Sequence, residues 1–81
     1  MKIHGYSNQG LPIEKIRPEE LAEITLVASP TELRKIAAFL ISAADNMERM
    51  GISYSHEHLA DKQLGFESSP HFVVFNPIVA G

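Results

Sequence analysis

The stretch SPTELRKIAAFLISAADNMERMG, residues 29–51, decides the fold because it carries the start and stop signals of one long helix. Ser29 stands at the N-cap position, and Glu32 follows three residues later, which completes a capping box. At the other end, Gly51 can adopt the left-handed backbone conformation that terminates a helix. The sequence therefore predicts a helix over residues 30–50.

This helix carries a wider apolar surface than a single sheet covers. At 100° per residue its apolar side chains span about 200°, whereas a helix packed on one sheet needs about 100–120°. We expect loops of the chain, or another molecule, to cover the excess. The apolar positions are Leu33, Ile36, Ala37, Leu40, Ala44 and Met47, widened by Phe39, Ala43 and Met50 on one side and Ile41 on the other.

Three further segments, residues 1–7, 21–28 and 72–75, are predicted as strands. The second alternates apolar and polar side chains, which is typical of a half-buried strand. The third is apolar throughout, which predicts a strand covered on both faces or lying inside a sheet. Residues 56–65 could form a short helix that ends at Gly65, or residues 53–61 could form another strand, and the strand is favoured.

The order of these elements predicts an α+β fold in a single domain over residues 1–81. We expect a small, largely antiparallel sheet of three to four strands, with one long helix packed across one face.

Composition excludes several classes of protein. The chain has 7 Lys+Arg against 10 Asp+Glu, a formal net charge of −3, which is a poor match for nucleic acid. It has no Cys, which excludes a disulfide-stapled secreted mini-protein. Its longest apolar run is far shorter than the roughly 18–20 residues of a membrane-spanning helix. We therefore predict a cytoplasmic protein that binds neither nucleic acid nor membrane.

One group of side chains has the character of metal ligands. On a strand, His56 and His58 project from the same face, and Asp61 follows shortly after. Two imidazoles and a carboxylate are zinc ligands, and His4 and His71 would join them if their strands were neighbours. The alternative is ordinary surface histidine, which the pattern favours because the HExxH spacing is missing.

No catalytic residue and no cofactor is expected. The chain lacks a Cys nucleophile, a GxSxG elbow and a glycine-rich phosphate loop.

Two other features have two interpretations each. Glu19, Glu20 and Glu23 belong to an acidic run that is either a surface for a basic partner or a solubilising loop. The apolar tail at residues 78–80 either closes over the core or forms an oligomer contact.

Four stretches of the chain together resemble the bacterial immunity protein 32 family: MKIHGYSNQGLP, LAEITLVASPTELRKIAAFLISAADNME, HEHLAD and HFVVFNP. Members are small proteins proposed to neutralise polymorphic toxins. The less generic matching positions are His56, His58, Leu59, Asp61 and the pair Asn76-Pro77. The resemblance implies a bacterial protein with no enzymatic activity and no cofactor.

The sequence therefore predicts a non-enzymatic protein that binds a protein partner and resembles an immunity protein that neutralises a toxin by occluding it. The expected contact residues are Glu19, Glu20, Glu23, His56, His58 and Asp61. The alternative is a metal-binding protein or small metalloenzyme that uses His56, His58 and Asp61. A homodimer, in which the helix face and the tail pack between copies, is compatible with either function.

Overall fold

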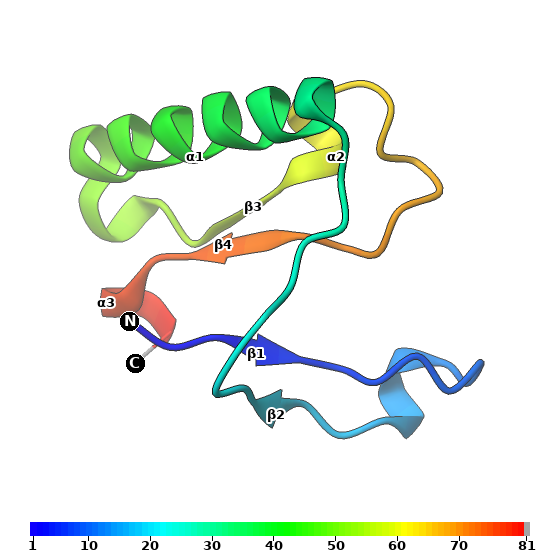
Figure 1. Ribbon diagram of the computed structural model, residues 1–81. Coiled ribbons are helices and arrows are strands. Elements are labelled where there is room, and N and C mark those ends of the chain that lie inside the picture. The colour runs from blue at the N-terminus through cyan, green and yellow to red at the C-terminus, as the bar shows by residue number, and fades with distance from the viewer. Residues whose placement is uncertain (81) are drawn as a thin grey trace.

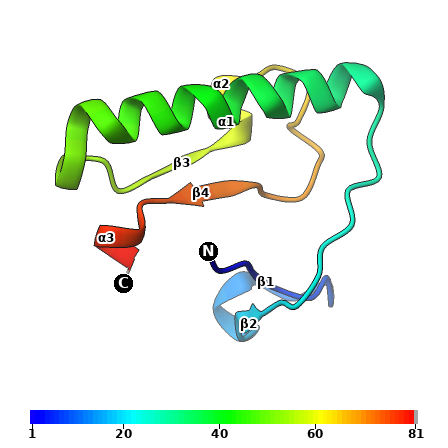
Figure 2. The same cartoon turned by 60° about the vertical axis from the view of Figure 1, so that its left-hand side comes forward.

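A computed structural model describes residues 1–80 and shows one long helix with two short antiparallel ribbons. Helix α1 lies on one side, the β3–β4 ribbon lies next to it, and the β1–β2 ribbon lies on the far side of β3–β4 from the helix (Figure 1). The same order is seen in the rotated view (Figure 2). In chain order the elements are β1 (His4–Gly5), η1 (Ile13–Lys15), β2 (Glu19–Glu20), α1 (Pro30–Met50), η2 (Gly51–Ser53), β3 (His56–His58), α2 (Leu59–Lys62), β4 (Val73–Phe75) and α3 (Pro77–Ala80).

The predicted boundaries of helix α1 are confirmed. The Ser29 hydroxyl accepts a 3.2 Å hydrogen bond from the Glu32 backbone N–H, and the Glu32 carboxylate accepts a 2.8 Å bond from the Ser29 N–H. Gly51 has a positive φ of 55°, as expected, but its ψ of −131° lies outside the left-handed helical region. Its N–H still bonds to the Met47 carbonyl, and the chain continues into the 3-10 turn η2.

A small core joins α1 to the ribbon beside it. Phe39 is 2% exposed, and its ring packs edge-to-face against Phe72 with the centroids 6.3 Å apart. Edge-to-face contact is a favoured arrangement of two aromatic rings. The core residues are Ile36, Phe39, Leu59 and Phe66, with Phe72 and Val74 packed against them.

The buried stripe of α1 is narrower than its apolar surface. Only Ile36, Phe39 and Ala43 are buried, whereas Leu40 is 43% exposed and Ile41 is 65% exposed. The buried residues therefore lie along one side of the predicted apolar surface of α1. The rest of the apolar surface is largely left uncovered by residues 1–80. Within this described part of the chain, no helix is both long enough and apolar enough to cross a bilayer.

The α+β class is confirmed, but the strands divide into two separate ribbons and do not form one sheet of three to four. β1 pairs with β2, and β3 pairs with β4, both antiparallel. The prediction of a strand over residues 21–28 is wrong: after the Leu21 N–H donates to the Ile3 carbonyl, the chain leaves β1 and runs to α1 without a partner strand. The pairing residues of β2 lie just before it, in the run expected to be a loop.

The predicted strand over residues 53–61 and the alternative short helix over residues 56–65 each describe part of the structure. β3 occupies residues 56–58, and the one-turn helix α2 begins at Leu59.

The prediction for the apolar run at 72–75 is corrected, because β4 pairs only with β3 among the described strands and Phe75 is 53% exposed. This strand is therefore an edge, ended as expected at Asn76-Pro77.

The C-terminal turn α3 leaves apolar side chains in contact with solvent. Ile78 is 72% exposed and Val79 is 45% exposed. These two side chains therefore do not close over the core.

Asn76 ties the end of β4 to the turn after α1. It is 1% exposed, and its side-chain amide donates 3.0 Å hydrogen bonds to the carbonyls of Gly51 and Tyr54. Its side-chain oxygen accepts a 3.1 Å bond from the Ile78 N–H. One polar side chain thus satisfies three backbone groups.

We expect Asn76→Ala to lower the free energy of unfolding by about 2–3 kcal/mol, because it leaves buried backbone groups without partners. Urea denaturation at neutral pH measures the change. Asn8→Ala, in an exposed loop, is the matched control and should shift the free energy by no more than about 0.5 kcal/mol. Equal effects of the two substitutions would contradict this role of Asn76.

Candidate partner-binding surface

The pleat of β3 separates its three side chains between two faces of the ribbon. Glu57 points toward α1, where its carboxylate accepts a 3.3 Å hydrogen bond from the Asn46 amide. His56 and His58 therefore project from the opposite face, since side chains alternate along a strand. The prediction that these two imidazoles share a face is confirmed.

The register of the ribbon adds two residues of β4 to the same face. His56 pairs with Phe75, and His58 pairs with Val73. The His56 ring stacks on the Phe75 ring with the centroids 4.7 Å apart and an interplanar angle of 19°. We call this surface, formed by His56, His58, Val73 and Phe75, the outer face of the ribbon.

Three imidazoles form a row on and beside the outer face. The His58 ring lies 5.4 Å from the His56 ring and 6.1 Å from the His71 ring, edge-to-face in both cases. His71 thus joins the group, whereas His4 does not, because β1 pairs with β2. We refer to His56, His58 and His71 as the imidazole row.

Asp61 lies at one end of this row and not in its middle. Because β3 ends at His58, Asp61 falls on α2. There it lines a cavity of about 320 Å³ together with His58 and His71, while His56 lies outside that cavity. Within residues 1–80, no three His, Asp or Glu side chains are arranged to hold a metal ion. The imidazole row presents ring nitrogens that can donate or accept hydrogen bonds.

Behind the outer face, Glu57 anchors a polar network that the sequence did not reveal. The Lys62 ammonium lies 3.2 Å from its carboxylate, and the buried Tyr54 hydroxyl approaches it without meeting hydrogen-bond geometry. Burial, together with the nearby carboxylate, raises the pKa of Tyr54 to about 12. Burial also tends to raise the pKa of Glu57, but the contacts from Tyr54, Asn46 and Lys62 outweigh it and lower that pKa.

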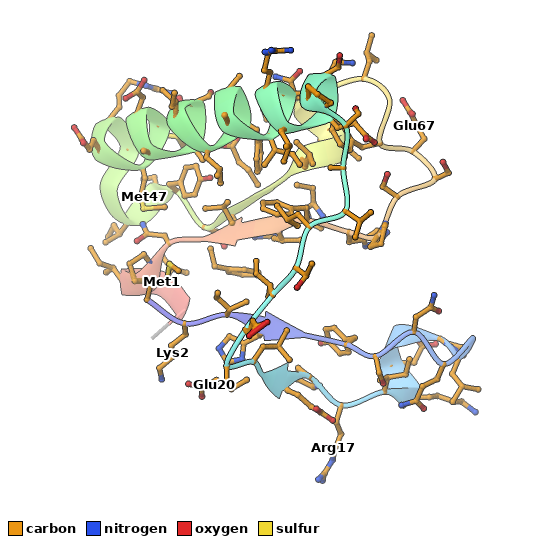
Figure 3. The ribbon with its side chains drawn as sticks, in the orientation of Figure 1. Met1, Lys2, Arg17, Glu20, Met47 and Glu67 are labelled. Atoms are coloured by element: carbon orange, nitrogen blue, oxygen red, sulfur yellow. The ribbon has the colours of Figure 1, made fainter. Side chains whose placement is uncertain are left out.

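The three acidic candidates lie apart from the imidazole row. Glu19 and Glu20 form β2, opposite Gly5 and His4, and Glu23 lies in the segment that follows; all three are exposed. Figure 3 shows Glu20 on the β1–β2 ribbon, on the side of the molecule away from α1. Among residues 1–80 no hydrogen bond or ion pair links this group to His56, His58 or Asp61. The six predicted residues thus form two separate groups.

Comparison with known proteins assigns the chain to a family. The sequence model of the immunity protein 32 family matches residues 23–77, more than half of the chain. This chain belongs to the immunity protein 32 family. No curated protein and no solved structure matches it.

The family match covers the imidazole row but only part of the acidic group. Helix α1, the β3–β4 ribbon and α2 lie within it, as do His56, His58 and Asp61. Glu23 is its first residue, and Glu19 and Glu20 precede it. The sequence did not predict Phe75 as a surface residue, because it ends an apolar run that is typical of a core strand, and that run has no polar residue to mark an exposed face.

We expect Glu57→Gln to destabilise the protein at neutral pH and to do so less in acid. Since the pKa of Glu57 is lowered in the folded state, its charge stabilises the fold above the unfolded pKa of about 4.3, and this contribution is lost as the pH falls through the folded pKa. Urea denaturation of both proteins at pH 7 and at pH 3.5 measures the difference. A loss that is the same at both pH values would argue against an ionised, network-bound Glu57.

Proposed function

We propose that this chain is a non-enzymatic immunity protein that binds a bacterial protein toxin and neutralises it by covering the toxin's active surface. The family match over residues 23–77 carries this proposal. In this role the chain acts in the cytoplasm of the bacterium that makes the toxin, where it blocks toxin molecules before they are exported. The protein works by occupying a surface, so it needs neither a catalytic group nor a cofactor.

The outer face of the ribbon supplies the centre of the proposed contact. Phe75 is 53% exposed and is held in place by its stacking on His56. Aromatic side chains that are already ordered lose little conformational freedom on binding, and aromatic residues, Phe included, are enriched in protein interfaces. His58, with Asp61 beside it, adds hydrogen-bonding groups at the edge of the same patch.

The exposed carboxylates of Glu19, Glu20 and Glu23 form an acidic rim in this proposal. Exposed charges act mainly on the rate at which partners meet, because their attraction extends over about 10 Å at moderate salt. A basic toxin surface would therefore be steered toward the chain by these residues and then held by the outer face.

The test starts from the genes that flank the gene for this chain, among which the proposal expects one that encodes a protein toxin. Co-expression of the chain should restore growth of cells that express the toxin, and the two purified proteins should form a complex on size-exclusion chromatography. Phe75→Lys should weaken binding at least tenfold by isothermal titration calorimetry, because it places a charge at the centre of the contact. Ile41→Lys, at an apolar position of α1 that is 65% exposed and lies outside the proposed contact, is the matched control and should leave binding unchanged.

Two outcomes would count against these proposals, and they are distinguishable. Absence of both growth rescue and complex formation would overturn the toxin-neutralising role. A normal complex that Phe75→Lys does not weaken would keep that role and remove the outer face as its contact.

We expect the double substitution Glu19→Gln and Glu20→Gln to slow association with the toxin severalfold while leaving dissociation nearly unchanged. The reason is that these exposed carboxylates contribute long-range attraction and no buried contact. Surface plasmon resonance at low and high salt separates the two rates. A faster dissociation with unchanged association would place the two residues inside the contact.

A further inference from the structure

The chain exposes more surface than a folded monomer of its mass. Its solvent-accessible area is 6654 Å², whereas a 9.0 kDa monomer is expected to expose about 4,900 Å². Its radius of gyration is 13.5 Å, against about 11.7 Å for a compact domain of 81 residues. The excess of about 1,800 Å² is roughly twice what one partner buries in a standard protein interface. A second molecule therefore has ample surface to cover.

Part of this surface is an extended backbone without hydrogen-bond partners. Among residues 1–80, no backbone hydrogen bond involves residues 22–28, which connect β2 to α1. The segment is seen in Figures 1 and 2 as the long connection that climbs past the ribbons to the start of α1. Its apolar side chains are exposed: Ile24 by 46%, Leu26 by 48% and Val27 by 97%. Unpaired extended backbone with apolar side chains is a template for pairing with another strand.

The sequence of this segment, EITLV at residues 23–27, is complementary to itself in antiparallel pairing. With Thr25 opposite its own copy, Ile24 faces Leu26 and Glu23 faces Val27 on both sides of the axis. Apolar and Thr–Thr pairs across a ladder are favourable, and the single charge of the segment does not meet a like charge. The same arrangement at β2 would bring the carboxylates of Glu19 and Glu20 against those of the other copy. A second copy of this chain is therefore the partner that this segment fits.

We propose that two copies of this chain associate through antiparallel pairing of residues 23–27 about a two-fold axis at Thr25. The contact is isologous, so it closes as a dimer. It supplies partners for the free N–H and C=O groups of the segment and buries Ile24 and Leu26 of both copies. This interface differs from the helix face and tail expected from the sequence, and it goes beyond the proposed function because no toxin takes part.

The test substitutes Thr25, because a residue on the two-fold axis faces the same residue of the other copy. Sedimentation velocity at high micromolar concentration should show the native chain at twice its 9.0 kDa mass. Thr25→Asp alone and Thr25→Lys alone should each weaken the dimer at least tenfold, because like charges then face each other. An equimolar mixture of the two variants should restore it. Ser42→Asp and Ser42→Lys, at an exposed hydroxyl on α1, are the matched controls and should dimerise as the native chain does.

A cross-link provides a second measurement that does not depend on charge. The chain has no cysteine, so Thr25→Cys introduces a single thiol. Residues that face each other in an antiparallel pair have Cα atoms about 4.5–5.5 Å apart, within the range a disulfide spans. Mild oxidation should give a covalent dimer with Thr25→Cys and little with Ser42→Cys.

Three results would overturn the proposal: a native chain that is monomeric at these concentrations, a dimer that neither Thr25 charge variant weakens, or a mixture that remains monomeric. Circular dichroism melting of each variant checks folding, which should be intact because the Thr25 backbone makes no hydrogen bond within the chain.

Discussion

The packing of Phe39 is the contact on which the rest of this structure depends. Its ring is 2% exposed and lies against Phe72, with Ile36, Leu59 and Phe66 completing the core around it. These residues come from α1, α2 and the loop that follows α2, so one cluster fixes the relative positions of these segments. Truncating a buried Phe typically costs about 3–5 kcal/mol, a large part of the roughly 5–15 kcal/mol by which a domain is stable.

The same core determines which side chains are offered to a partner. Val74 packs against the core, and Glu57 on the paired position of β3 bonds to Asn46 of α1. Because side chains alternate along both strands, His56, His58 and Phe75 must then face away from the helix. The alternation of side chains along the strand is therefore sufficient to expose the imidazoles of β3. Any register shift of one residue would exchange the two faces and bury the imidazoles.

The sequence predicted the features that depend on neighbouring residues and failed where distant segments must meet. The capping box at Ser29 and Glu32 involves residues three apart, so helix α1 could be placed from both of its ends. Residues 21–28 have the alternation of a strand, but alternation does not specify a partner, and β1 pairs instead with Glu19 and Glu20. For the candidate site, the shared face of His56 and His58 follows from period two, whereas the approach of His71 and the exposure of Phe75 depend on the β3–β4 register.

The small core leaves apolar side chains available to both of the proposed association surfaces. Among the residues whose side chains the structure describes, six apolar ones are buried, while large apolar side chains on α1, on the 22–28 segment and on α3 remain exposed. A chain this small cannot enclose all of its apolar residues, and it has no disulfide to compensate, so association is the remaining way to bury them. The family match begins at Glu23, where the self-complementary segment begins, and it includes the imidazole row. Both surfaces therefore belong to the matched part of the chain, whereas Glu19 and Glu20 belong to the ribbon that precedes it. In the proposed arrangement, the outer face that holds the toxin lies inside the match, whereas two of the three rim carboxylates precede it, so the charge of Glu19 and Glu20 can be altered without changing the outer face.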